Sequence, residues 1–324
     1  MPDLSGGSVV VAEVVRSGFV EARHRGSVLV LGPDGADVLV RGDVDSPLFP
    51  RSCNKPLQAV AMLRQGLTLD PRLVALAAAS HSGEEIHAAG VRRILAGVGL
   101  DEQALQTPPD WPLDDSVREE ALRAGAQRSP ILMNCSGKHA AMLATCVING
   151  WDTGSYLEPA HPLQQGIAQT FADLAGGPVA AEGIDGCGAP LLSASLRGLA
   201  AAFARLATAA GETPEGAVAA AIRVHPEMVS GTRRDEAALL RALPGAIAKA
   251  GAEACYVLAL PDGTSVALKI EDGGARARPV VMAATLRLLG LQHPVLAEQS
   301  AAAVLGGGQS VGEVHAVLDQ RHAL

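Results

Sequence analysis

Two β-hairpin signals, one near each end of the chain, constrain its fold more than any other feature. The segments at 27–42 (SVLVLGPDGADVLVRG) and 255–273 (CYVLALPDGTSVALKIEDG) both place Pro-Asp-Gly between β-rich arms. This pattern is typical of two strands joined by a short glycine-containing loop. A further strand is expected at 8–18 (SVVVAEVVRSG). We therefore expect an antiparallel sheet built from both ends of the chain.

Most of the chain between the hairpins carries apolar residues at helical spacing. Helices are expected within residues 56–66, 71–80, 85–99, 116–127, 138–150, 161–177 and 190–211, and a last helix at 278–291 follows the second hairpin. No linker and no repeat of solenoid length divides the chain. The pattern predicts a single domain over residues 1–324, with an α/β fold and one mixed or antiparallel sheet.

Composition excludes several classes of protein. A net charge of −8 and an aromatic content of 2% argue against binding to nucleic acid, which favours basic surfaces and stacking rings. The N-terminal segment has no basic leader and its apolar run is broken by Glu13, so we expect neither a secretory signal nor a membrane anchor. A cytoplasmic location is therefore expected. Five cysteines, an odd number, make a disulfide framework improbable there.

Lysine is scarce in this chain. Of the 26 basic residues only four are lysines, namely Lys55, Lys138, Lys249 and Lys269. Only lysine can give up its proton near neutral pH, since arginine stays charged. Three of the four lie in polar motifs, whereas Lys249, in AIAKAG, is interpreted as an ordinary cation at a helix end.

The segment RSCNKPLQ places Ser52 and Lys55 three residues apart, on one face of a helix. Proline is tolerated only near a helix start, so Pro56 puts Ser52 at the mouth of the helix. There the helix dipole and free N–H groups favour a developing alkoxide and an oxyanion. Lys55, partly buried and deprotonated, could take the proton of Ser52. The alternative is a capping serine followed by a surface lysine.

Two other segments add polar groups. AAASHSGEE places Ser80, His81 and Ser82 in a polar turn after an apolar helix, where functional groups are often exposed. Lys269 interrupts the arm of the second hairpin. The alternative for Lys269 is an outward-facing side chain on an alternating strand.

Two glycine-containing cysteine loops are present, NCSGKHAAM (134–142) and GIDGCGAPLL (183–192). The first is too short for a phosphate-binding Walker loop. Cys135 as a nucleophile with His139 as its base remains open. Cys135 and Cys187 on two glycine turns suit a soft divalent metal such as zinc. The alternative is plain burial, which we expect for Cys146 and Cys255.

The motifs RSCNKPLQA, SHSGE, NCSGKHAAML, DGCGAP and ALKIEDG, in this order over most of the chain, resemble those of the Rhizobium-type L-asparaginases, also called the thermolabile or asparaginase II family. The resemblance implies a fold like that of serine β-lactamases and penicillin-binding proteins, in which helices pack on a central, mostly antiparallel sheet. It also implies a homodimer that hydrolyses L-asparagine, a small-molecule substrate, to L-aspartate and ammonia.

The resemblance also assigns residues by motif. Ser52 and Lys55 match the first serine–lysine pair of the family, Ser80 its second serine and Lys269 its second lysine. The family often carries asparagine where this chain has Ser82, and spacing leaves open which of Ser80 and Ser82 supplies the working hydroxyl.

The remaining assignments concern metal and substrate. The zinc ligands of the family match Cys135, Lys138 and Cys187. Ligation by an amine requires a neutral lysine, which arginine cannot replace. Residues within or beside the motifs are expected to contact substrate, namely Arg51, His81, His139, Asp185 and Gly186.

The expected mechanism is attack of Ser52, activated by Lys55, on the side-chain carboxamide, which gives an acyl-enzyme and ammonia before water releases aspartate. Ser80 would relay a proton and Lys269 would add positive charge near the oxyanion.

A glutaminase is the nearest rival, because one methylene is worth only about 1–3 kcal/mol of discrimination. A penicillin-type acylase is disfavoured because KIE stands where Lys-Thr-Gly is expected. A rival of another class is a zinc-dependent binding module.

Overall fold

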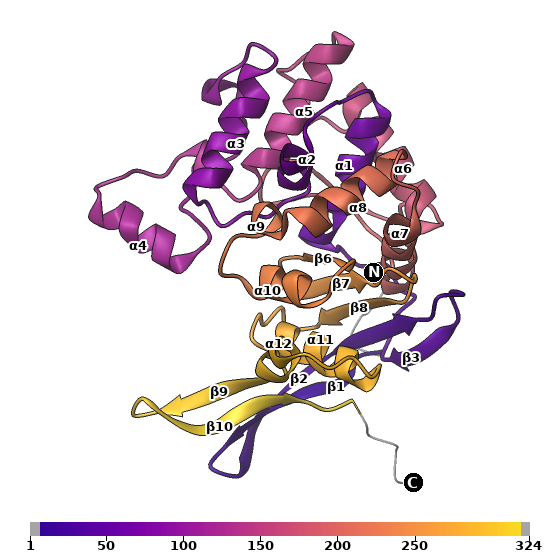
Figure 1. The fold of residues 1–324 in the computed structure, drawn as a ribbon, viewed down its shortest axis with the longest axis vertical. Helices are drawn as coiled ribbons and strands as arrows, with labels where there is room; N and C mark the ends of the chain where they lie inside the picture. Colours follow the sequence, from indigo (N-terminus) through magenta and orange to yellow (C-terminus); the bar gives the residue numbers. More distant parts are fainter. Residues whose placement is uncertain (1–6, 319–324) are drawn as a thin grey trace.

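The computed structural model describes residues 7–318 and has an α/β fold, in which helices pack on an antiparallel sheet (Figure 1). The strand order is β6-β7-β8-β2-β1-β10-β9, with β3 also paired to β2. The sheet strands are β1 (Val9–Arg16), β2 (Phe19–Leu31), β3 (Asp37–Arg41), β6 (Ile247–Ala250), β7 (Cys255–Ala259), β8 (Ser265–Ile270), β9 (Ala301–Gly306) and β10 (Gln309–Ala316). The predicted sheet from both chain ends is confirmed.

Both predicted hairpins are present. β2 pairs with β3, and β7 pairs with β8, in antiparallel register. Gly35 (φ +79°) and Gly263 (φ +94°) in the two connecting loops adopt a left-handed conformation that favours glycine. Because β2 also pairs with β8, the two hairpins join into one sheet and Ser27 lies opposite Lys269.

Most helices form a layer beyond the β6 edge of the sheet, and others pack on the sheet itself (Figure 1). Their bounds are α1 (Lys55–Arg64), α2 (Pro71–Ala77), α3 (Glu85–Ala96), α4 (Asp115–Arg123), α5 (Ser136–Asn149), α6 (Pro162–Ala175), α7 (Leu196–Thr208), α8 (Pro214–Val224), α9 (Pro226–Val229), α10 (Asp235–Ala242), α11 (Ala277–Leu288) and α12 (Pro294–Gln299). α7 packs on β2, β7 and β8, whereas α11 packs on β1, β8 and β10. Helices α1, α2, α5, α6 and α8 pack on one another.

The structure differs from the sequence-based expectation in several elements. The C-terminal hairpin of β9 and β10 was not predicted, nor were the helices α8, α9, α10 and α12. The helix expected from residue 190 begins only at Leu196, because Pro190–Leu192 forms β5 and pairs with β4 (Glu182–Ile184). β9 has an alanine-rich sequence with little intrinsic strand preference, and its pairing with β10 decides its conformation.

The interpretation of Lys249 as a helix-end cation was wrong. Lys249 lies on the edge strand β6, is fully buried, and pairs with the buried carboxylate of Glu236. The segment is too short for a helix after Pro244 and Gly245, and pairing of β6 with β7 makes it a strand.

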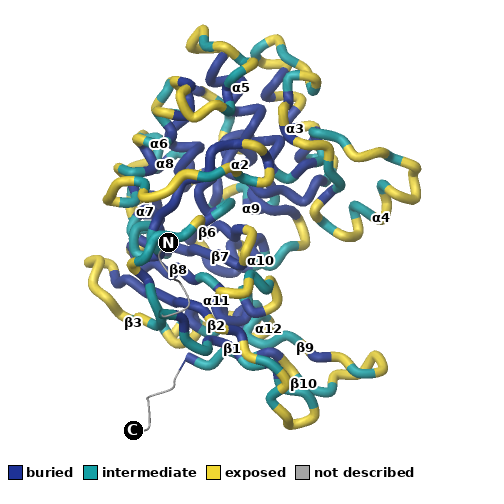
Figure 2. The backbone as a smooth tube through the Cα atoms, turned by 180° about the vertical axis from the view of Figure 1, so that it is seen from behind, coloured by how far each residue is buried: buried dark blue, intermediate teal, exposed yellow. Residues whose placement is uncertain are grey.

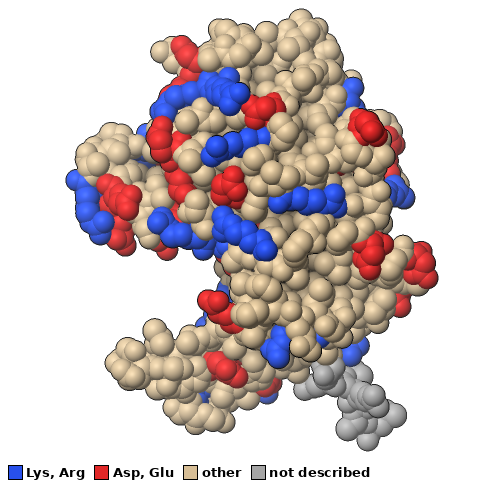
Figure 3. Space-filling view, viewed as in Figure 1, with Lys and Arg blue, Asp and Glu red and all other residues tan. Residues whose placement is uncertain are grey.

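The β9–β10 hairpin and the turn between β1 and β2 project beyond the helices, and exposed residues gather at their tips (Figure 2). On the face in Figure 3, acidic and basic side chains are interspersed. None of the helices in residues 7–318 is both long and apolar enough to cross a lipid bilayer. The first six residues of the N-terminal segment considered above as a leader lie outside the described residues.

Candidate active site

Ser52 lies in a 3₁₀ turn (Arg51–Asn54) that leads directly into α1. Pro56 lies in the first turn of α1, as the sequence predicts. The turn contacts β6 and β7, so Ser52 sits where the helical layer meets the edge of the sheet. Arg51 has a left-handed backbone (φ +53°), which is strained for a residue other than glycine and is found often at functional turns.

Lys55 is buried, and its contacts lie at the end of α2. Its Nζ donates to the carbonyl of Ala79 at 2.6 Å and to the Ser80 hydroxyl at 2.9 Å. Within residues 7–318 Lys55 has no carboxylate partner and no hydrogen bond to Ser52. Lys55 is therefore not the surface lysine of the alternative interpretation.

The structure places Ser80 and Ser82 in different surroundings. Ser80 accepts the hydrogen bond from Lys55, and its own carbonyl accepts from the guanidinium of Arg234 at 2.8 Å. Ser82 is fully buried and donates to the carbonyl of Ser230 at 2.7 Å. Only the Ser80 hydroxyl faces Lys55, whereas the Ser82 hydroxyl holds a loop.

His81 is fully buried between these serines. Its Nδ1 accepts from the N–H of Gly83 at 3.2 Å, so the proton belongs on Nε2, which lies 2.9 Å from the Ser136 hydroxyl. The ring stacks on that of His87 at 5.0 Å. The pKa of His81 lies well below its usual range, chiefly because the ring is buried and secondarily because His87 is nearby. Both ring nitrogens are engaged by the protein, and His81 thereby joins the Ser80 turn to the start of α5.

Lys269 lies on β8 and is half-buried. Its Nζ donates to the carbonyl of Ile270, and its backbone pairs with that of Cys255. Burial lowers the pKa of Lys269. The thiol of Cys255 lies beside that of Cys53, the neighbour of Ser52. In the described part of the chain no hydrogen bond or ion pair joins Lys269 to Ser52, Lys55 or Ser80.

Arg51 links the Ser52 turn to the second cysteine loop. Its Nε donates to Asp185 Oδ1 at 2.8 Å, and the same oxygen accepts from the N–H of Gly186 at 2.9 Å. Asp185 lies two residues before Cys187, in the loop between β4 and β5. The structure thus joins three of the predicted site residues, Arg51, Asp185 and Gly186, in one contact.

The cysteine loops come together in a small buried cluster of Met133, Cys135, Cys187 and Ala189. Lys138 Nζ lies 3.2 Å from the sulfur of Cys187, and its side chain is buried. His139 also lies beside Cys187, and its Nδ1 is 2.7 Å from the Tyr156 hydroxyl. The structure therefore gathers all three predicted metal ligands.

The electrostatics of the cluster favour a thiolate. A hydrogen bond with Cys135 holds the pKa of Cys187 far below its usual range, and Lys138 adds to the effect against the opposing influence of burial. The same hydrogen bond and burial raise the pKa of Cys135. Burial would lower the pKa of Lys138, but the two sulfurs outweigh it and raise that pKa. Metal binding here would therefore displace a proton from Lys138.

The donor types fit zinc, which prefers sulfur and nitrogen ligands. Among residues 7–318 no group of three His, Cys, Asp or Glu side chains could hold a metal, so a site at this cluster depends on the Lys138 amine. His139 is buried beside Cys187, but it does not complete a metal site of His and Cys side chains with the two cysteines.

Sequence reasoning missed Arg234, Tyr156 and Glu236, which contact Ser80, His139 and Lys249. Rarity could have indicated Tyr156, since the chain has only two tyrosines. Arg234 stands in GTRRDE, which looks like ordinary surface sequence, and no sequence signal singles it out.

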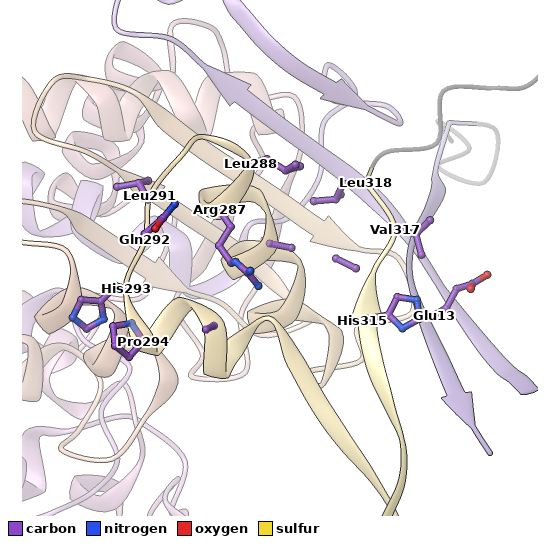
Figure 4. Close-up of a pocket in the computed structure, with 13 residues that line it drawn as sticks. Glu13, Arg287, Leu288, Leu291, Gln292, His293, Pro294, His315, Val317 and Leu318 are labelled. Atoms are coloured by element: carbon purple, nitrogen blue, oxygen red, sulfur yellow. The ribbon is translucent and has the colours of Figure 1, made fainter. Parts of the chain in front are cut away.

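A wide cavity lies away from these residues, between α11, α12, the middle of β1 and the end of β10 (Figure 4). Its lining includes Arg287, Leu288, Leu291, His293 and His315. None of the predicted catalytic, metal-binding or substrate-binding residues lines it.

Comparison with family models gives a match over most of the chain. A family model described as L-asparaginase II matches residues 12–316. None of the curated proteins matches the sequence.

Solved structures give weaker likenesses. A structure titled Mglu in its native form is 17% identical, with a TM-score of 0.43 over 89% of this chain and 69% of that one. A Bacillus glutaminase is 12% identical, with a TM-score of 0.43 over 82% of this chain and 91% of the other. A β-lactamase from Mycobacterium bovis is 14% identical, with a TM-score of 0.38 over 82% of this chain and 95% of that one.

Proposed function

Because the chain belongs to the L-asparaginase II family, we propose that it hydrolyses the side-chain amide of L-asparagine through an acyl-enzyme formed on Ser52. The observation that carries this proposal is the placement of Lys55. It is buried, lies three residues after Ser52 in the sequence, and contacts the hydroxyl of Ser80 instead of a carboxylate. A buried amine whose partners are a hydroxyl and a backbone carbonyl suits proton transfer better than it suits a structural ion pair.

In this mechanism Lys55, acting as an amine, takes the proton of the Ser52 hydroxyl as the oxygen attacks the carboxamide carbon. The tetrahedral intermediate collapses, and the proton passes to the leaving nitrogen, which departs as ammonia. Ser80 carries protons between Lys55 and the leaving group, because its hydroxyl can donate and accept at once. Water, deprotonated by the same groups, then releases aspartate from Ser52.

The start of α1 supplies the electrostatics. Its N–H groups and dipole favour negative charge that develops near Ser52. Lys269 adds a positive charge on β8, the strand paired with β7, which the Ser52 turn contacts. Arg51 is held by Asp185, and this contact fixes the backbone just before the nucleophile.

Cys135, Lys138 and Cys187 would hold a zinc ion, with His139 beside them. When bound, the metal would supply a positive charge that orients the amino-acid end of the substrate. The loop that holds Cys187 adjoins the Ser52 turn through the Arg51–Asp185 contact, so the cluster suits substrate affinity more than water activation.

Ammonia release by the metal-analysed protein, with L-asparagine and L-glutamine at equal concentrations, tests the proposal. We expect a clear preference for L-asparagine. Preference for L-glutamine would make the enzyme a glutaminase, and release from neither amide would contradict the proposed activity. The homodimer and the cytoplasmic location remain predictions, and sedimentation of the same preparation tests the first.

A further inference from the structure

A fully buried ion pair lies behind the Ser52 turn. Glu236, in the first turn of α10, and Lys249, on β6, are both completely shielded from solvent. Lys249 Nζ lies 3.2 Å and 3.3 Å from the two carboxylate oxygens of Glu236. Within the described residues, this is the only ion pair in which both side chains are fully buried.

Stability does not explain such a pair. Removing two charges from water costs free energy that their attraction often fails to recover, and apolar residues of similar volume frequently serve as well. The chain also uses arginine for most of its cations, so one of its few lysines at a buried position calls for a specific role.

The pair holds both polar backbone groups of one residue, Ala250, at the end of β6. Glu236 Oε2 accepts from the Ala250 N–H at 3.0 Å, and Lys249 Nζ donates to the Ala250 carbonyl at 2.8 Å. β6 is an edge strand, so its outer side has no neighbouring strand in the described sheet to hold it. The two charges fix the backbone at that point.

The end of β6 is also the support of the Ser52 turn. Cys53 Sγ donates to the carbonyl of Lys249 at 3.1 Å. At Gly251 a Cβ atom would lie 2.7 Å from the carbonyl oxygen of Pro50 and 3.3 Å from the backbone nitrogen of Ser52. The backbones at Gly251 and Ser52 are therefore in close contact, and a small shift of β6 would move Ser52.

We propose that Glu236 and Lys249 are positioning residues for Ser52, acting through Ala250 and Gly251. The inference rests on the proposed function, because it concerns the hydroxyl assigned there as nucleophile. Neither residue contacts the reacting atoms in this account. Their effect is on the rate of reactions at Ser52, with little effect on substrate affinity.

Two variants test the role. Glu236→Gln keeps the size and one of the two acceptor oxygens but removes the charge. The double variant Glu236→Leu/Lys249→Met replaces the pair by apolar groups of similar volume. The control is Arg64→Met/Glu215→Leu, which removes a partly exposed ion pair between α1 and α8. Each full-length protein is compared for melting temperature, kcat and KM, and for phosphonylation of Ser52 by a fluorophosphonate probe, followed by peptide mass spectrometry.

We expect both variants to remain folded and to lose about 10- to 100-fold in kcat with KM within about twofold, since a small misplacement of a reacting group has effects of this size. Phosphonylation should slow by a similar factor, and the control should match wild type. Wild-type rates in folded Glu236→Gln and in the double variant would overturn the proposal. Removing one partner of a buried pair destabilises more than replacing both, so if either variant does not fold, the other alone decides.

The probe separates this proposal from the proposed function. If the wild-type protein hydrolyses neither amide but the probe labels Ser52, the proposed activity fails, and the phosphonylation rates still decide the positioning role. If the probe does not label Ser52 in the wild-type protein, Ser52 is not a competent nucleophile and the positioning proposal is overturned as well.

Discussion

The amine of Lys55 lies 2.9 Å from the hydroxyl of Ser80, a residue 25 positions further along the chain. This contact joins the start of α1 to the end of α2, and it brings the serine–lysine motif and the SHSGE motif into one site. The two serines of the second motif have different roles: the Ser80 hydroxyl contacts Lys55, whereas the Ser82 hydroxyl is bonded to the carbonyl of Ser230.

Ser80→Ala should lower kcat by about 100-fold or more, the usual contribution of a positioned proton-transfer group. Ser82→Ala, its matched control, should keep kcat but lose about 1–3 kcal/mol of stability, because it leaves a buried carbonyl without its donor. Steady-state kinetics and denaturant unfolding of the two variants check the assignment. A larger loss of kcat in Ser82→Ala than in Ser80→Ala would reverse it.

Cys187→Ser should lose bound zinc and raise KM while the protein stays folded. The surroundings of Cys187 lower the pKa of its thiol and so favour the thiolate, the form that binds zinc. Cys146→Ser, which alters a buried cysteine in the same helix as Lys138, should retain the metal. Metal analysis, KM and circular dichroism give the comparison. Unfolding on loss of zinc would favour a structural site, as in a zinc-dependent binding module.

Stability should fall on acidification below about pH 6.5, the ordinary pKa of histidine. Burial holds the pKa values of His81 and His87 below that value in the folded protein. Below pH 6.5 the unfolded chain binds more protons than the folded protein. The stability that these neutral rings contribute is therefore fully present above pH 6.5 and declines as the pH falls through the folded-state pKa values.

Unfolding free energies from pH 7 to 5, above the range in which most carboxylates titrate, measure this decline. His87→Gln should reduce the slope with pH, because it removes one of the two buried neutral rings. A flat profile in the wild-type protein would contradict the assignment of buried neutral histidines.

Gly137→Ala should destabilise the fold by about 1–3 kcal/mol, the usual cost of overpacking. A Cβ at this position would lie 2.6 Å from the backbone carbonyl of Leu76, where α5 packs on α2. A backbone atom cannot move aside as a side chain can. Gly211→Ala is the control, because nothing lies within 4 Å of a Cβ there. Equal stability of the two variants by urea unfolding would contradict the close approach.

The sheet could be predicted where turn chemistry marks its strands. The two Pro-Asp-Gly loops locate β2, β3, β7 and β8, because the signal lies within a few residues of the strands that it joins. The C-terminal hairpin lacks this combination, and its first arm is rich in alanine. Its conformation depends on the pairing of β10 with β1, about 300 residues away in sequence, which no local pattern reveals.

The site could be predicted as a set of residue types but not as a set of contacts. Scarce lysines and glycine-flanked cysteines indicated Lys55, Lys138 and Cys187. The partners that define their surroundings, such as Ala79 and Ser80 for Lys55, come from long-range packing. Lys249 shows the limit, since the same short sequence suits a helix end or a buried strand until Glu236 is placed beside it.

The most direct test of the account is ammonia release from L-asparagine by Ser52→Ala compared with wild-type protein, both shown to be folded by circular dichroism. Removing the nucleophile while retaining Lys55, Ser80 and the cysteine cluster should abolish nearly all turnover. Turnover by Ser52→Ala near the wild-type rate would show that another group carries the reaction and would contradict the acyl-enzyme mechanism at Ser52.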